Sequence, residues 1–127
     1  MFTHVTVGAN DIEASRAFYD AALGALGIGP GQGPDPKGRY WWRTPRGAFA
    51  VGKPIDGGEA CHANGGTIGF GATKLEMIQA FHDAGVANGG KAIEDPPGER
   101  TGAFGTLNLA YLRDPSGNKI CAMYRVG

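Results

Sequence analysis

Hydrophobic and polar residues alternate at the start of the chain and then recur with a helical period. Val5 and Val7 alternate with polar or small residues over residues 4–8, which is the pattern of a half-buried strand. Asn10 follows as the expected N-cap, and Gly24 and Gly27 are helix-stop residues. Between them, one helical face carries Ile12, Ser15, Tyr19, Ala22, Leu23 and Leu26. These positions predict a strand, a turn and a helix.

The same strand and helix recur later in the chain. A shift of 63 positions places His4–Gly27 over Thr67–Gly90 without a gap. Eight of these 24 pairs are identical: Gly8/Gly71, Ala9/Ala72, Glu13/Glu76, Ala17/Ala80, Phe18/Phe81, Asp20/Asp83, Ala21/Ala84 and Gly27/Gly90. We expect the stripe of the second helix to consist of Leu75, Ile78, Phe81, His82 and Val86. The chain is therefore interpreted as two copies of one module.

A strand–turn–strand hairpin is predicted after each helix. In the first module, Tyr40–Arg43 leads through a Thr-Pro-Arg-Gly turn into Ala48–Val51. In the second module, Asn108–Arg113 leads through an Asp-Pro-Ser-Gly turn into Asn118–Arg125. Each module therefore consists of a strand, a helix and two or three antiparallel strands.

The two hairpins match at an offset of 70, seven more than the offset of the helices. We predict that the extra residues fall in Glu94–Gly105, a mobile loop that could cap a cavity, because this segment has two prolines and three glycines. The stretch from Gly27 to Arg39 is likewise read as a mobile connection with at most a poor strand inside it. The offset gives the equivalent pairs Trp41/Tyr111, Arg43/Arg113 and Val51/Cys121.

Length and composition limit the classes of protein to consider. The 127 residues suit one compact domain, with a first module at 1–56, a linker at 57–64 and a second module at 65–127. Twelve basic and twelve acidic residues without a basic stripe make nucleic acid or an anionic membrane an unexpected partner. The start of the chain has no signal-peptide pattern, and Cys61 and Cys121 are expected to be free thiols, so we expect a cytoplasmic protein.

Two stretches of the repeat are specific enough to compare with known families. They are HVTVGANDIEASRAFYD at the start of the first module and YLRDPSGNKI at the end of the second. Together with the βαβββ pattern, they resemble the vicinal oxygen chelate superfamily, the group of glyoxalase I, bleomycin-resistance proteins and extradiol dioxygenases. The resemblance covers nearly the whole chain. It implies an α+β fold of two pseudo-symmetric βαβββ modules, whose mostly antiparallel, curved sheets enclose a cavity with the helices outside, and it favours a homodimer.

The resemblance also implies where a divalent metal would bind. Metalloenzymes of the superfamily take ligands from the first and last strands of each module, and carrying these places over gives His4, Val51, Thr67 and Cys121. Valine cannot coordinate a metal, threonine is a weak neutral ligand, and cysteine prefers softer ions than the family's Mn, Fe, Ni or Mg. Since a catalytic metal site generally needs three protein ligands, we expect no functional metal, with His4 as the only plausible retained ligand.

Strand parity independently predicts an inner face. Alternate residues of a strand face opposite sides, so His4 and Thr6 share a face with Thr67, while Val5 and Val7 pack under the helix. The same parity is extended to Phe49, Val51 and Cys121 on the closing strands, whereas the directions of Trp42 and Asn108 stay open. Arg100 in the Pro/Gly loop is a candidate to meet an anionic ligand group, with a solvated loop charge as the alternative. The predicted ligand contacts beyond His4 are Thr6, Trp42, Phe49, Val51, Thr67, Arg100, Asn108 and Cys121.

These observations predict a glyoxalase-like protein that binds a small, partly apolar organic molecule in its cavity without the family's metal. His4 is the catalytic candidate, as a proton-transfer group, although binding or sequestration without catalysis fits the same residues. The alternative is a metal-dependent lyase or dioxygenase that uses His4 as one ligand. A third hypothesis is an interaction subunit with a collapsed cavity. The expected partners are the small-molecule ligand and a second copy of the chain.

Overall fold

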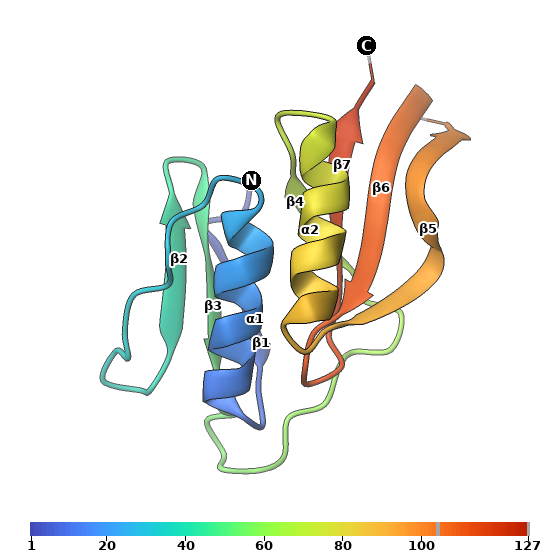
Figure 1. Ribbon diagram of the computed structural model, residues 1–127. Coiled ribbons are helices and arrows are strands. Elements are labelled where there is room, and N and C mark those ends of the chain that lie inside the picture. Colours follow the sequence, from blue (N-terminus) through green and yellow to red (C-terminus); the bar gives the residue numbers. More distant parts are fainter. Residues whose placement is uncertain (104, 127) are drawn as a thin grey trace.

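The computed structural model describes residues 1–103 and 105–126, and they form two repeats. The elements of the first repeat are β1 (His4–Gly8), α1 (Ile12–Gly24), β2 (Tyr40–Thr44) and β3 (Gly47–Gly52). The elements of the second are β4 (Ile68–Gly71), α2 (Glu76–Ala87), β5 (Lys91–Gly102), β6 (Gly105–Arg113) and β7 (Lys119–Arg125). The predicted α+β fold class is confirmed (Figure 1).

The two repeats build two mixed sheets of three and four strands, since β5 of the second repeat corresponds in the first only to an isolated bridge between Gln32 and Trp41. The strand order is β1-β3-β2 in one sheet and β4-β7-β6-β5 in the other. In each sheet the first and last strands of the repeat pair in parallel, and the other pairs are antiparallel. Helices α1 and α2 lie side by side over one face of the sheets (Figure 1). The opposite face, which we name the open face, has no helix over it, so the described chain alone does not close the sheets around a cavity.

Helix α1 begins one residue later than its sequence signal suggested. The N-cap is Asp11, whose carboxylate accepts a hydrogen bond from the backbone N–H of Ala14. The side chain of Asn10, the expected cap, instead bonds both the N–H and the C=O of Ala60 in the linker. The helix ends at Gly24, and Gly27 has a φ of 82°, as expected for a helix stop. Asn10 therefore fastens the linker to the start of the helix.

The segment predicted as a mobile loop, Glu94–Gly105, is instead largely strand. Strand β5 continues to Gly102 and pairs with β6, with a register shift between Ile93 and Gly98. The guanidinium group of Arg100 donates hydrogen bonds to the carbonyl groups of four residues within or beside this bulge: Asp95, Pro96, Gly98 and Glu99. Two of these acceptors, the carbonyl groups of Asp95 and Pro96, lie in the register shift, where the strand has no ladder partner. Sequence reasoning missed the strand because prolines and glycines within a bulge resemble a loop.

The predicted offset of 70 holds for one strand of the hairpin and fails for the other. Since Val5 pairs with Phe49 and Ile68 pairs with Ile120, β7 matches β3 at an offset of 71. Strand β6 matches β2 at the predicted offset of 70, but the turn between β6 and β7, counted between equivalent paired residues, contains one residue more than the turn between β2 and β3. A slip of one residue turns every side chain of a strand to the other face. The residue equivalent to Cys121 is therefore Ala50 rather than Val51.

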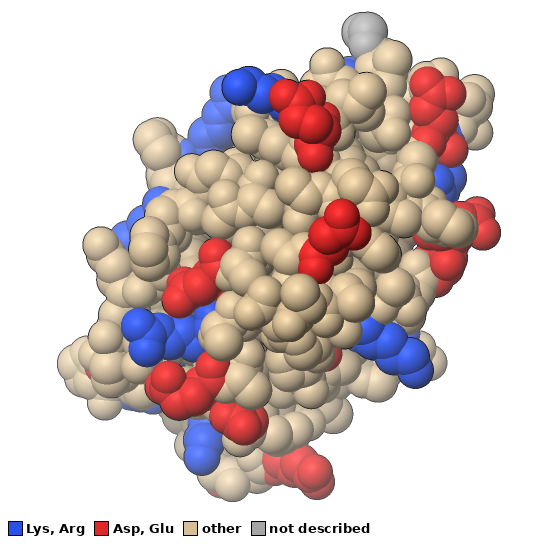
Figure 2. All heavy atoms as spheres, in the orientation of Figure 1, with Lys and Arg blue, Asp and Glu red and all other residues tan. Residues whose placement is uncertain are grey.

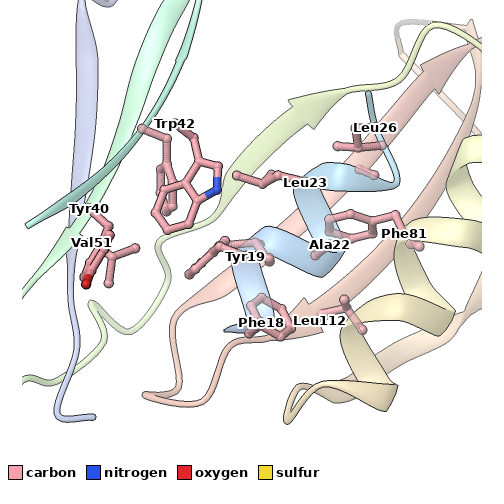
Figure 3. Packing of buried hydrophobic residues seen from close by; sticks show 14 of the residues in the cluster. Phe18, Tyr19, Ala22, Leu23, Leu26, Tyr40, Trp42, Val51, Phe81 and Leu112 are labelled. Carbon is pink, nitrogen blue, oxygen red and sulfur yellow. The ribbon is translucent and has the colours of Figure 1, made fainter. Parts of the chain in front are cut away.

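The core is a single hydrophobic cluster that spans both repeats. Residues of α1 lie between Trp42 of the first sheet and Phe81 and Leu112 of the second repeat (Figure 3). A Cβ atom at Gly85 would lie 2.4 Å from Leu112 and 3.1 Å from Phe18, so this glycine lets the two helices approach. The predicted stripe of α2 is correct for Ile78 and Phe81 and wrong at its ends, since Leu75 and Val86 are exposed.

A buried hydrogen-bond network joins α1 to the β6–β7 turn. The hydroxyl of Tyr19 donates to Oδ2 of Asp114 at 2.6 Å, and Nδ2 of Asn118 donates to the same oxygen at 2.8 Å. The other oxygen of Asp114 accepts from the backbone N–H groups of Ser116 and Asn118. Both Tyr19 and Asp114 are less than 5% exposed. The turn of the second repeat is therefore fixed by a residue of the first.

The surface over the helices carries no extended charge. Acidic and basic side chains are scattered over the helix side of the molecule, and neither sign forms a continuous stripe there (Figure 2). Among the described residues, neither helix has the length and apolar character needed to cross a membrane.

We predict that Asp114→Ala destabilises the fold by about 2–4 kcal/mol, because it leaves several buried donors without an acceptor. The measurement is chemical denaturation followed by far-UV circular dichroism. Asp56→Ala is the control, since Asp56 is an exposed turn residue that accepts a bond from Gly58. A loss for Asp114→Ala no larger than for the control would contradict the structural role of the network.

Candidate functional site

The open face of the first sheet is built in rows that cross β1, β3 and β2. Strand β1 contributes polar side chains, β3 contributes small ones, and β2 contributes an aromatic and a cationic one. Because β1 and β3 are parallel and β2 is antiparallel to them, each row is fixed by the strand register. By row, the members are His4, Ala48 and Arg43, and then Thr6, Ala50 and Trp41.

The indole ring of Trp41 lies across this face. Its centroid is 5.9 Å from that of His4, which stands two strands away. The intervening Ala50 has no exposed surface, as expected for a small residue beneath a ring. Nε1 of Trp41 donates to Oδ2 of Asp35 at 2.9 Å, and Nε of Arg39 donates to the same oxygen at 2.7 Å. These bonds, with that from Trp41 the strongest influence, lower the pKa of Asp35 well below its usual value and fix the ring.

Two arginines flank this ring. The guanidinium carbons of Arg39 and Arg43 lie 5.1 Å and 4.6 Å from the indole centroid of Trp41. Asp35 pairs with Arg39, whereas no carboxylate of the described residues lies within 4.0 Å of Arg43. Sequence reasoning did not select these residues. The sequence pattern that could have identified them is the spacing of Arg39, Trp41 and Arg43 at every second residue, which puts them on one face of β2 and the residue before it, opposite the small residues of β3.

His4 is exposed at the edge of this face. Its Nδ1 atom lies 2.9 Å from the hydroxyl of Thr3, and the described residues provide no hydrogen-bond partner for Nε2. A ligand can therefore reach Nε2 without displacing a protein contact. This geometry suits a histidine that accepts or donates one hydrogen bond or a proton.

A cavity of about 640 Å³ lies between β1 and β4, and we name it the inter-sheet cavity. It brings together three residues that the sequence selected, His4, Trp42 and Phe49. The hairpin turn of the first sheet, residues 44–47, borders it as well. Its apolar wall is made of Val5, Leu23, Leu26, Ile28, Ile68 and Phe70. A cavity of this size with a few polar groups suits a small organic molecule.

A second cavity, of about 710 Å³, lies at the other end of the open face beside the linker, and we name it the linker cavity. Thr6 lines this cavity rather than the first one. Basic and acidic side chains both line it: the cations are Lys37, Lys53 and Arg39, and the acids are Asp56 and Glu59. Two of the predicted ligand contacts, His4 and Thr6, therefore belong to different cavities.

Two closing-strand residues point to the opposite side from the one predicted. Phe49 and Val51 pair with Val5 and Val7, so they lie on the helix face of the first sheet, and their predicted direction is wrong. The physical reason is the one-residue slip between β3 and β7. Asn108, whose direction was left uncertain, shares the helix face of its sheet with Ala110 and is buried. Val51 lines neither of the two cavities.

The open face of the second sheet contains Cys121 as predicted. Burial raises the pKa of the Cys121 thiol to about 11, so it is protonated at neutral pH. Lys119 contacts the carboxylate of Glu94 and lies 5.0 Å from the ring centroid of Tyr111. Thr67 is exposed just before β4. Arg100, predicted to meet a ligand, uses both terminal nitrogens for the carbonyl groups of the β5 bulge.

The residues at the expected metal-ligand positions do not fit a divalent metal. After the register correction these positions hold His4, Ala50, Thr67 and Cys121. Alanine provides no donor, and a protonated thiol must lose its proton to bind a metal. The described residues contain no group of three or more His, Cys, Asp or Glu side chains arranged to hold an ion.

Comparison with known proteins relates the chain to one family. The family model described as Glyoxalase/Bleomycin resistance protein/Dioxygenase superfamily matches residues 1–122. A crystal structure of a glyoxalase/bleomycin resistance protein from Albidiferax ferrireducens T118 is 58% identical, with a TM-score of 0.95, over 98% of this chain and 99% of that one. No curated protein gives a significant match.

More distant structures share the fold. A family enzyme from Burkholderia phytofirmans PsJN is 16% identical, with a TM-score of 0.71, over 98% of each chain. A lactoylglutathione lyase from Agrobacterium tumefaciens is 17% identical, with a TM-score of 0.66, over 98% of this chain and 92% of that one. The family match over residues 1–122 and the fold shared with these structures lead to one conclusion. The chain belongs to the glyoxalase/bleomycin resistance protein/dioxygenase superfamily.

Proposed function

We propose that this protein binds a small, partly apolar organic molecule at the inter-sheet cavity, without a divalent metal. The observation that carries the proposal is the position of His4, which lines an otherwise largely apolar cavity and whose Nε2 atom has no hydrogen-bond partner among the described residues. The apolar wall favours a carbon frame, and the imidazole provides a polar contact that orients it. If the protein is catalytic, His4 is the group placed to transfer a proton.

The ligand positions support the metal-free part of the proposal. A divalent ion of the kind used in the family needs several oxygen or imidazole donors, and of the four places only His4 offers one that is ready to coordinate. The competing function is a metal-dependent lyase or dioxygenase with His4 as one ligand. Metal content separates the two functions directly.

We also propose a cytoplasmic homodimer. The two thiols are free, with Cys61 exposed and Cys121 buried, which is typical of a reducing compartment. The open faces expose Met123 and several glycines, and a second copy placed against them would cover both sheets. Light scattering at micromolar concentration is expected to give twice the mass of the chain, and a monomer under these conditions would count against the pairing.

The ligand proposal is tested by screening small alcohols, amides and acids for stabilisation. A compound that binds only the folded protein raises its melting temperature in proportion to its occupancy. We expect hits whose stabilisation is lost in His4→Ala and retained in His62→Ala, because His62 is an exposed linker residue that does not line the cavity. A screen without stabilising compounds, or compounds that stabilise His4→Ala as much as the unmodified protein, would refute binding at the inter-sheet cavity.

The metal-free proposal predicts that EDTA, nickel and manganese leave the melting temperature unchanged, since an ion that does not bind the native state adds no stability. His4→Ala is expected to cost less than about 1 kcal/mol, because the side chain is exposed. The measurements are thermal unfolding and metal analysis of both proteins. Stoichiometric metal in the unmodified protein that disappears in His4→Ala would establish the metalloenzyme instead.

A further inference from the structure

The side of the inter-sheet cavity formed by residues 44–48, which we name its mouth, carries a cationic side chain and no acidic one. Among the described residues that line the cavity, Arg46 is charged, His4 can become so, and none is acidic. A shallower depression beside the same hairpin turn adds Arg43 and again no acidic residue. Both depressions share the turn residues 44–48, so Arg43 stands at the rim of the cavity.

Arg43 is held in place without being neutralised. Its guanidinium group lies against the indole of Trp41, which Asp35 fixes through Nε1. Its neighbours in the row are Ala48 and, beyond it, His4, which both line the cavity. Stacking on an aromatic ring leaves the N–H groups of the guanidinium available for a carboxylate. The binding group is therefore positioned before a ligand arrives, which reduces the entropic cost of binding.

We propose that the ligand is a partly apolar organic acid. Its carboxylate binds Arg43 at the mouth, with Arg46 as the second cation, and its apolar part enters the inter-sheet cavity. This inference rests on the proposed function and adds the charge of the ligand. The linker cavity supports no equal argument, because its lysines are opposed by Asp56 and Glu59 and its arginine, Arg39, is already paired with Asp35.

The two tryptophans, Trp41 and Trp42, can report separately on the charged end and the apolar end of such a ligand. The indole ring of Trp41 lies against Arg43 and its N–H bonds Asp35, whereas the N–H of Trp42 bonds Asp20 and the Trp42 side chain lines the cavity. The sequence has two tryptophans, so a proton–nitrogen NMR spectrum contains two indole signals, which Trp41→Phe assigns. A charged headgroup and an apolar body therefore perturb different signals.

The probes are benzoate, benzyl alcohol and acetate, titrated at constant ionic strength because surface charge interactions are screened by salt. We expect benzoate to shift both indole signals, benzyl alcohol to shift that of Trp42, and acetate to shift that of Trp41. Benzoate is expected to bind about tenfold more tightly than benzyl alcohol, the typical value of a charge-assisted hydrogen bond.

The decisive variant is Arg43→Met, which keeps an apolar stem on the Trp41 ring and removes the charge. It should weaken benzoate about tenfold and leave benzyl alcohol within twofold of its original affinity. Lys91→Met is the control, because it removes an exposed cation of the second sheet that is not over Trp41. Melting temperatures of all variants confirm that each is folded.

Each outcome decides between the two proposals. Equal affinity for benzoate and benzyl alcohol, or benzoate binding that survives Arg43→Met, overturns the organic-acid inference and leaves the cavity proposal intact. No shift of either signal with benzoate up to its solubility limit also overturns the inference. If benzyl alcohol and the screened compounds fail as well, the proposed function falls with it.

Discussion

The hydrogen bond from Tyr19 to Asp114 is the contact on which the arrangement of the two repeats depends. The ring of Tyr19 packs 4.7 Å from Phe49 in the first sheet, while its hydroxyl reaches the turn between β6 and β7 in the second. Burial, with the carboxylate of Asp114 as a further cause, raises the pKa of Tyr19 well above 10.0, so the hydroxyl remains a donor at neutral pH. Small modules of this size bury too little surface to be stable alone, and α1 provides the shared core.

The repeat made most of the fold predictable. Strand and helix periods recur at a fixed offset, and identical pairs such as Phe18/Phe81 and Gly27/Gly90 mark equivalent positions within and just after the two helices. Turn length was the weak point. One additional residue in the β6–β7 turn displaced the match of β3 by one position, and this reversed the predicted side of Phe49 and Val51. A prediction that counts residues through a turn is therefore less secure than one made within a strand.

The candidate site was harder to predict, because its determinants are contacts between elements far apart in the chain. His4 was selected from its place on β1, and it does line the inter-sheet cavity. The fixing of Trp41 by Asp35 depends on the loop before β2, which the sequence indicated only as a mobile connection with a poor strand. Likewise, the use of Arg100 within the β5 bulge could not be read from its position among prolines and glycines. Residue type indicated charge in both cases, whereas only the folded chain assigns the partners.

The small residue at position 50 and the position of the Trp41 ring are related, because Ala50 and Trp41 are register partners on neighbouring strands. Ala50 occupies the place where the resemblance to the superfamily would put a ligand on the last strand, and the indole of Trp41 lies over it. A glutamate at this position would need the volume that the ring fills, and interiors tolerate such insertions poorly. If the ring moved away, Arg43 would lose the surface that it stacks on. A metal-binding carboxylate at position 50 would therefore compete for space with the Trp41 ring that supports Arg43, and this chain has the ring.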